Sequence, residues 1–168
     1  LSAPAILTGS WSISEIITQQ AASGWTLLVQ PLGFLLAIVG LIGKLKRVPF
    51  DIPKAKSEVV GGPLTEFSGR KLALWHLTVK IQTVAGIFLL VNMFLGGGDL
   101  TLVQGSMPLG LARAATFAAK ALFMLLTLSV TSVLYARLRI DQLASLGWRI
   151  LAPLGLLQLA ATILMGIR

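Results

Sequence analysis

The hydrophobic pattern of the chain consists of four long apolar runs separated by shorter polar segments. The runs cover about residues 25–43, 72–95, 112–136 and 149–167. Each is long enough to cross a bilayer as a helix, because the hydrocarbon core requires about 20 apolar residues. The pattern therefore predicts an all-α membrane protein with about four transmembrane helices and a folded cytoplasmic loop.

Composition supports the membrane class. Charged residues make up 12% of the chain and the mean hydropathy is +0.86, whereas soluble domains carry about 25% charged residues. The net charge of +8 does not indicate nucleic-acid binding, because the basic residues gather at the ends of the apolar runs and not in one soluble patch. We expect the lipid bilayer as a partner and no nucleic acid.

The positions of the charges predict which loops face the cytoplasm. Lys/Arg-rich short loops stay on the cytoplasmic side, and half of the 14 basic residues lie in residues 44–71. We therefore expect loops 44–71 and 137–149 to be cytoplasmic and residues 1–24 to be external. The chain starts with Leu1 in an apolar segment, so we expect residues 1–24 to follow an upstream helix that is missing or encoded separately, and residues 25–168 to form the transmembrane domain.

The long loop 44–71 has its own helix signals. Asp51 close before Pro53 is typical of a helix start, and the Gly-Gly pair at 61–62 is typical of a helix stop. We expect a short helix over 53–60. A 28-residue loop with such internal signals is folded and not a flexible tether.

Three basic side chains lie well within the apolar runs and away from their first and last residues. His76 and Lys80 share one helix face with Thr83, because the three are spaced i, i+4 and i+7. A lysine near the bilayer centre costs at least about 2.5 kcal/mol, so these groups either face the bundle interior or extend to the membrane surface. Lys120 lies about two turns deeper than Arg113, and here an interior, functional cation is the favoured interpretation.

The residue types present limit the chemistry of the chain. There is no cysteine and there is one histidine, which excludes cysteine-bound iron–sulfur or zinc sites and argues against any self-contained metal site. No nucleophile–histidine–acid set and no phosphate-binding glycine loop is present. We expect no catalytic residues, and we assign any redox metal to a partner.

Two segments carry a family resemblance. RVPFDIPKAKSEVVGGPLTEFSG (residues 47–69) and RLRIDQLASLGWRILAP (residues 137–153) resemble the signature loops of the NADH dehydrogenase subunit 1 family, and residues 8–20 are a weaker third match. This family supplies the membrane subunits at the junction of respiratory complex I, with relatives in membrane-bound energy-converting hydrogenases. The resemblance covers nearly the whole chain and corresponds to the C-terminal half of the family.

The resemblance implies a non-catalytic membrane-junction subunit of a redox-driven ion-translocating complex in the cytoplasmic membrane of a prokaryote. It implies docking of iron–sulfur and large catalytic-type peripheral subunits, contact with antiporter-like membrane subunits, and coupling of electron transfer to proton or sodium translocation. Iron–sulfur clusters, with a nickel–iron centre or a quinone, are expected in or next to partner subunits. The implied residues are the coupling and docking loop Arg47, Asp51, Glu58, Glu66 and Arg70, the intramembrane charges His76, Lys80 and Lys120, and the second cytoplasmic cluster Arg137, Arg139 and Asp141.

The chain also departs from the family pattern. Lys54 and Lys56 stand where the family usually has acids, Val79 stands where a glutamate is often found, and Phe67 replaces a tyrosine. These departures slightly favour a hydrogenase-type complex over a quinone reductase. They leave open a non-conducting structural anchor of the same complex. A free-standing small transporter is the least favoured alternative, because no inverted repeat is evident.

Overall fold

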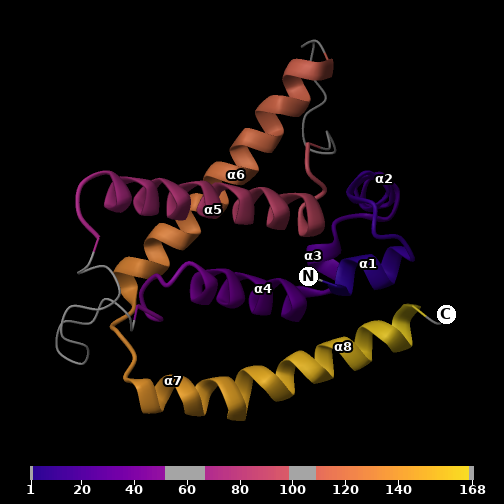
Figure 1. The fold of residues 1–168 in the computed structure, drawn as a ribbon. Coiled ribbons are helices and arrows are strands. Elements are labelled where there is room, and N and C mark those ends of the chain that lie inside the picture. Colours follow the sequence, from indigo (N-terminus) through magenta and orange to yellow (C-terminus); the bar gives the residue numbers. More distant parts are fainter. Residues whose placement is uncertain (1, 52–66, 99–108, 167–168) are drawn as a thin grey trace.

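The structure is a computed structural model, and it describes residues 2–51, 67–98 and 109–166 (Figure 1). Within these residues all regular secondary structure is helical. The helix predicted over 53–60 lies outside the described residues, and so do Glu58 and Glu66.

The described helices include elements within each of the four predicted apolar runs and two further helices before the first run. They are α1 (Ser2–Thr8), α2 (Ile13–Ser23), α3 (Thr26–Val29), α4 (Pro31–Lys44), α5 (Arg70–Phe94), α6 (Leu109–Leu134), α7 (Ile140–Leu146), a π-helical turn (Gly147–Leu151) and α8 (Ala152–Gly166). Within the described part of the chain, three helical stretches are long and apolar enough to cross a membrane, namely Arg70–Phe94, Gly110–Leu134 and Ile140–Met165. The predicted class, an all-α membrane protein, is confirmed.

The first apolar run differs from the single continuous helix that the pattern predicts over 25–43. The helix is interrupted at Gln30, whose φ of −132° and ψ of 64° are not helical, and α4 begins at Pro31. A proline ring disfavours the helical conformation of the residue before it and lacks an N–H to continue the helix. The 14 residues of α4 span about 21 Å at 1.5 Å per residue, which is shorter than a hydrocarbon core of about 30 Å.

The predicted loop 137–149 is mostly helical. The helix begins at Ile140 and continues through the π-helical turn into α8. Its start is capped, because the Arg139 backbone N–H donates to Gln142 Oε1 at 3.2 Å and Asp141 places a negative charge in the first turn. The π-helical turn, which is wider than an α-helical turn, lies just before Pro153. Proline has no backbone N–H, so it cannot donate the regular helical hydrogen bond at this position.

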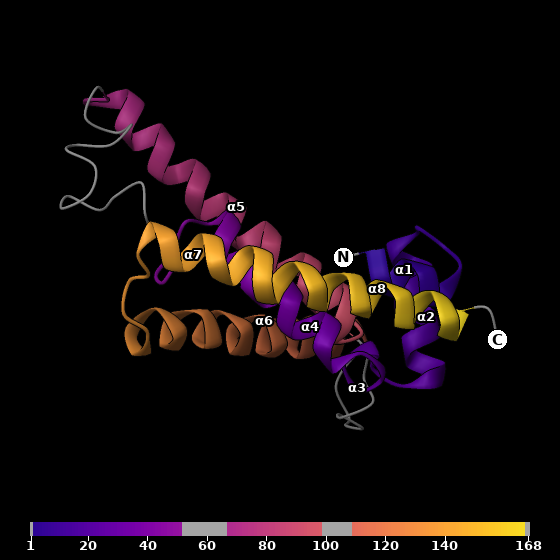
Figure 2. The same cartoon turned by 90° about the horizontal axis from the view of Figure 1, so that it is seen from below.

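The buried core lies between α4, α5 and α6. Figure 1 shows α4 between α5 on one side and the α7–α8 helix on the other, and the view from below in Figure 2 agrees. Phe34 and Phe94 join α4 to α5 edge-to-face with ring centroids 5.5 Å apart, and Phe88 and Phe117 join α5 to α6 at 4.9 Å. The buried members of this core are Leu41, Ile42, Leu45, Ile87, Leu90, Val91, Phe94, Leu95, Met124 and Leu128.

The two ends of the bundle differ in what they carry. Both chain termini lie at one end, together with α1, α2 and α3 (Figure 1). The end of α4, the start of α5, the end of α6 and the start of α7 lie at the opposite end. The first turns of α5 extend away from the other helices (Figure 2). The basic segments separated along the sequence therefore meet at one end of the molecule.

Candidate functional site

Two of the charged segments contact each other at the end of the bundle. Arg137 Nη2 donates to Asp51 Oδ2 at 3.3 Å, and the Leu138 backbone N–H donates to the Pro49 carbonyl at 3.2 Å. Asp51 is 8% exposed, whereas the Arg137 side chain is 48% exposed. We call these four residues the loop junction. Because the arginine is half exposed, the ion pair stabilises the fold by about 1 kcal/mol at most. Its structural effect is to join two segments that are 86 positions apart in the sequence.

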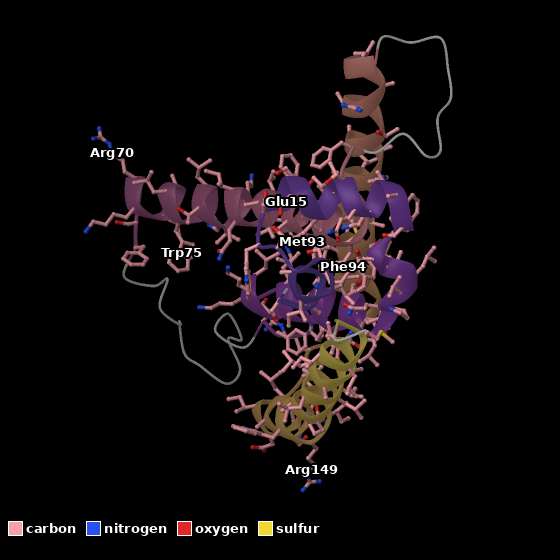
Figure 3. The ribbon with its side chains drawn as sticks, turned by 90° about the vertical axis from the view of Figure 1, so that its right-hand side faces the viewer. Glu15, Arg70, Trp75, Met93, Phe94 and Arg149 are labelled. Atoms are coloured by element: carbon pink, nitrogen blue, oxygen red, sulfur yellow. The ribbon has the colours of Figure 1, made fainter. Side chains whose placement is uncertain are left out.

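Among the described residues, the ion pair of this junction involves Arg137 and Asp51 and none of the other predicted loop charges. Arg47 is half-buried, and its carbonyl accepts from the Phe50 backbone N–H at 2.7 Å. Arg139 and Asp141 are exposed at the start of α7. Arg70 is exposed and lies at the far end of α5 (Figure 3).

The polar side chains that share one face of α5 differ in their exposure. His76 and Lys80 are exposed on the surface of this chain, whereas Thr83 is buried and its Oγ1 donates to the Val79 carbonyl at 2.8 Å. The exposure of the two basic residues follows from the position of the first turns of α5, which extend beyond the other helices (Figure 2).

Lys120 is half-buried against the end of α5. Its Nζ donates to the carbonyls of Leu95 at 2.7 Å and Gly97 at 3.1 Å, and it lies 4.9 Å from the centre of the Trp25 ring. The carbonyls at a helix C-terminus lack intrahelical partners and carry partial negative charge. An ammonium group placed there is stabilised by the carbonyl oxygens and by the aromatic face.

The structure does not bring Lys80 and Lys120 together. Lys120 contacts the C-terminal end of α5, and Lys80 lies 15 positions before Leu95 on the same helix. Fifteen residues of helix span about 22 Å. The predicted intramembrane charges are therefore separate groups and not one cluster.

A glutamine that the sequence did not single out also binds the end of α5. Gln20 on α2 is 2% exposed, and its Nε2 donates to the carbonyls of Met93 at 2.8 Å and Asn92 at 3.3 Å. Figure 3 shows Met93 and Phe94 beside α2. The C-terminus of α5 is thus capped by side chains from two other helices, Gln20 and Lys120. Nothing in the local sequence distinguishes Gln20 from its neighbour Gln19.

A second polar cluster joins the start of α4 to α8. Gln30 Nε2 donates to Thr162 Oγ1 at 3.0 Å, and Gln158 Nε2 donates to the same oxygen at 3.4 Å. The Thr162 hydroxyl donates in turn to the Gln158 carbonyl at 2.8 Å. The signal that could have identified this cluster is the i, i+4 pair Gln158 and Thr162 inside an otherwise apolar run.

The described site consists of fixed charges and hydrogen bonds. No group of three or more His, Asp or Glu side chains that could hold a metal occurs in residues 2–51, 67–98 and 109–166, and the chain has no cysteine. The arrangement is suited to binding charged surfaces at one end and to holding helix ends within the membrane. These features define a helical membrane protein with one charged end.

The family follows from comparison with known proteins. The chain matches the NADH dehydrogenase family over residues 1–163, and it belongs to that family. It is 34% identical over 159 residues to proteins named as the H-type subunit of NADH-quinone oxidoreductase in Bacillus thuringiensis (strain Al Hakam), Bacillus cereus (strain AH187) and Bacillus anthracis (strain CDC 684 / NRRL 3495). The match covers 95% of this chain and 46% of each relative, so the chain spans about half the length of these relatives. The resemblance that the two loop segments carry is confirmed.

Proposed function

We propose that this chain is a membrane-junction subunit of a complex-I-like redox-driven ion-translocating complex in a prokaryotic cytoplasmic membrane. It docks the peripheral iron–sulfur and large catalytic-type subunits, lies beside antiporter-like subunits, and couples electron transfer to proton or sodium translocation. The observation that carries the proposal is the loop junction, in which Asp51 and Arg137 hold two charged segments together. Opposite charges held in a defined geometry orient a charged partner.

Two observations bear on the electron acceptor of the proposed complex, and they favour different types of complex. The relatives are named as subunits of NADH-quinone oxidoreductase, which supports a quinone. The departures Lys54, Lys56 and Phe67 support a hydrogenase-type complex, which we favour slightly. Nickel together with iron in the purified complex would establish the hydrogenase type. Iron and acid-labile sulfide without nickel would establish a reductase of quinone or another acceptor, and the absence of both would contradict the redox complex.

The docking role is tested at the loop junction. Asp51→Asn removes the carboxylate that Arg137 binds, and we expect the purified membrane subunit to retain several-fold less of the iron-bearing peripheral subunits. The charge-exchanged double variant, Asp51→Arg with Arg137→Asp, should restore part of that binding. Glu15→Gln removes an exposed acid at the opposite end of the molecule and should change nothing. Full retention of the peripheral subunits and unchanged coupled turnover in Asp51→Asn would contradict the docking role.

The second candidate function is a structural anchor that docks partners without conducting ions. The separation of the predicted intramembrane charges favours it. Lys80 is exposed and lies about 22 Å along α5 from the carbonyls that hold Lys120. The two candidates differ in the expected effect of Lys80→Gln on ions translocated per electron in proteoliposomes. A conducting path through Lys80 requires a fall in that ratio, whereas an anchor predicts the wild-type ratio at the wild-type electron-transfer rate.

A further inference from the structure

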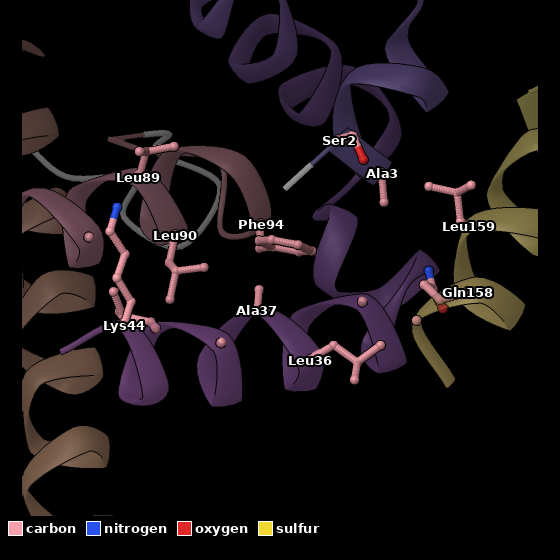
Figure 4. A pocket seen from close by; sticks show the side chains of 15 residues that line it. Ser2, Ala3, Leu36, Ala37, Lys44, Leu89, Leu90, Phe94, Gln158 and Leu159 are labelled. Atoms are coloured by element: carbon pink, nitrogen blue, oxygen red, sulfur yellow. The ribbon is translucent and has the colours of Figure 1, made fainter. Parts of the chain in front are cut away.

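A hollow lies between α4, α5 and α8 (Figure 4). Its volume is about 370 Å³, within the range of about 300–1,000 Å³ typical of small-molecule sites. We call it the α4–α8 groove. Its walls are mainly apolar, and the residues used below are Leu36, Ala37, Gly40, Leu90, Gly155 and Leu159.

Glycines keep the groove open. A Cβ atom added at Gly40 or Gly155 would meet no atom within 4 Å, so both glycines border empty space and larger side chains there would fill it. A second hollow of about 340 Å³ borders the same two glycines and reaches Phe50, just beyond the end of α4. The apolar space therefore continues along α4 towards the basic end of that helix.

The two ends of the groove differ in polarity. Lys44 lies at one end and Gln158 at the other (Figure 4). The Gln158 amide group already donates to Thr162 Oγ1, so the polar cluster closes that end. Lys44 is exposed at the end of α4 and is followed by Lys46 and Arg47. The groove is thus an apolar slot with a cationic mouth.

The shape and polarity of the groove indicate which kind of molecule fits. An acyl chain is thin and apolar, so it matches a mainly apolar slot that continues along α4, and it needs no hydrogen-bond partners along its length. Basic pockets between transmembrane helices bind the headgroups of anionic lipids, and the Lys44 mouth supplies such a charge.

We propose that the α4–α8 groove binds one acyl chain of an anionic phospholipid, with the headgroup phosphate on Lys44. The chain lies against Ala37 and Leu90 and passes the open sides of Gly40 and Gly155. The lipid fills space beside α4, the shortest of the apolar helices that border the core, and supports its packing against α8. This site is independent of the loop junction and of the proposed docking function.

The experiment uses the complex purified in mild detergent and reconstituted into nanodiscs. A phosphatidylglycerol with a diazirine in the middle of one acyl chain is added, and cross-linked peptides are mapped by mass spectrometry after illumination. We expect cross-links within residues 33–41 and 155–159. Lys44→Gln should lower their yield about fivefold, because one basic residue contributes about 1 kcal/mol to anionic-lipid binding. Lys71→Gln, which removes an exposed cation outside the groove, should leave the yield unchanged.

A second pair of variants separates the groove from the headgroup. Gly155→Leu fills the groove and should abolish the cross-links, whereas Gly110→Leu, also at a glycine with open space, should preserve them. Equal labelling by a phosphatidylcholine probe of the same chain length would overturn the assignment of the headgroup to Lys44. Absence of cross-links in both segments of the wild-type protein, or full labelling of Gly155→Leu, would overturn the site.

Discussion

At the scale of single residues, the two lysines within the membrane-spanning helices have different surroundings. Lys120 donates to two carbonyls at the end of α5 and lies against Trp25, whereas Lys80 is exposed on the surface of this chain. The difference arises because the end of α5 is packed within the bundle and its first turns are not (Figure 2). Lys120 therefore interacts with the end of α5, whereas Lys80 lies away from it.

Replacing Lys120 by methionine should destabilise the protein. The substitution keeps an unbranched side chain but leaves the Leu95 and Gly97 carbonyls without the ammonium donor. We expect a loss of about 1.5–3 kcal/mol, the usual contribution of a hydrogen bond to a charged group. The measurement is the thermal unfolding midpoint of the purified complex in detergent. Lys80→Met is the matched control, and an equal effect of both variants would contradict the capping role of Lys120.

At the scale of helices, close packing of α4 on α5 depends on Gly86. A Cβ atom added there would overlap Leu41 Cδ1, and Leu41 belongs to the buried core. Between membrane helices, small residues allow the backbones to approach closely, and packing is a main source of their association. Gly86 is therefore used in the α4–α5 contact, whereas Gly40 and Gly155 border open space.

The replacement of Gly86 by valine should loosen the α4–α5 contact. Overpacking of a filled core costs about 1–3 kcal/mol, so we expect a lower unfolding midpoint and faster proteolysis at the ends of α4. Gly110→Val places the same side chain in open space. It should be neutral or slightly stabilising, because glycine is a poor helix former. Wild-type stability of Gly86→Val would contradict this account of the packing.

At the scale of the whole molecule, the bundle has a basic end and an end that holds both termini (Figure 1). Positive residues retain short loops in the cytoplasm, which predicts the orientation of the whole bundle. The loop junction and the mouth of the α4–α8 groove then both lie near the cytoplasmic face. Peripheral subunits and anionic headgroups would meet the chain on that one side.

The orientation can be measured with single cysteines, because the natural chain has none. Ser68→Cys, exposed before α5, should react with a membrane-impermeant maleimide only when the cytoplasmic face is accessible. Ser14→Cys, exposed on α2, should react in intact cells. The unmodified chain serves as the control for labelling of other proteins. The reverse pattern of labelling would show that the bundle has the opposite orientation.

The class of this protein and most of its long helices follow from the amino-acid sequence alone. Apolar run length is a local property, and a bilayer requires each spanning segment to satisfy its own backbone hydrogen bonds, so the runs at 72–95 and 112–136 predicted α5 and α6 closely. The interruption at Gln30 is also a local effect, caused by Pro31, although the unbroken apolar run predicted one continuous helix over 25–43. The family was recognisable from two short segments.

Which polar groups meet depends on how the helices pack in three dimensions. Asp51 and Arg137 are 86 positions apart, and Gln30 and Thr162 are 132 positions apart. The hydropathy of a segment predicts that it prefers lipid. It does not predict which helix packs beside that segment or which helix end a given side chain contacts. Hydropathy left the position of Lys80 open and favoured an interior position for Lys120. The packing around the two ends of α5 leaves Lys80 exposed and places Lys120 against the end of that helix.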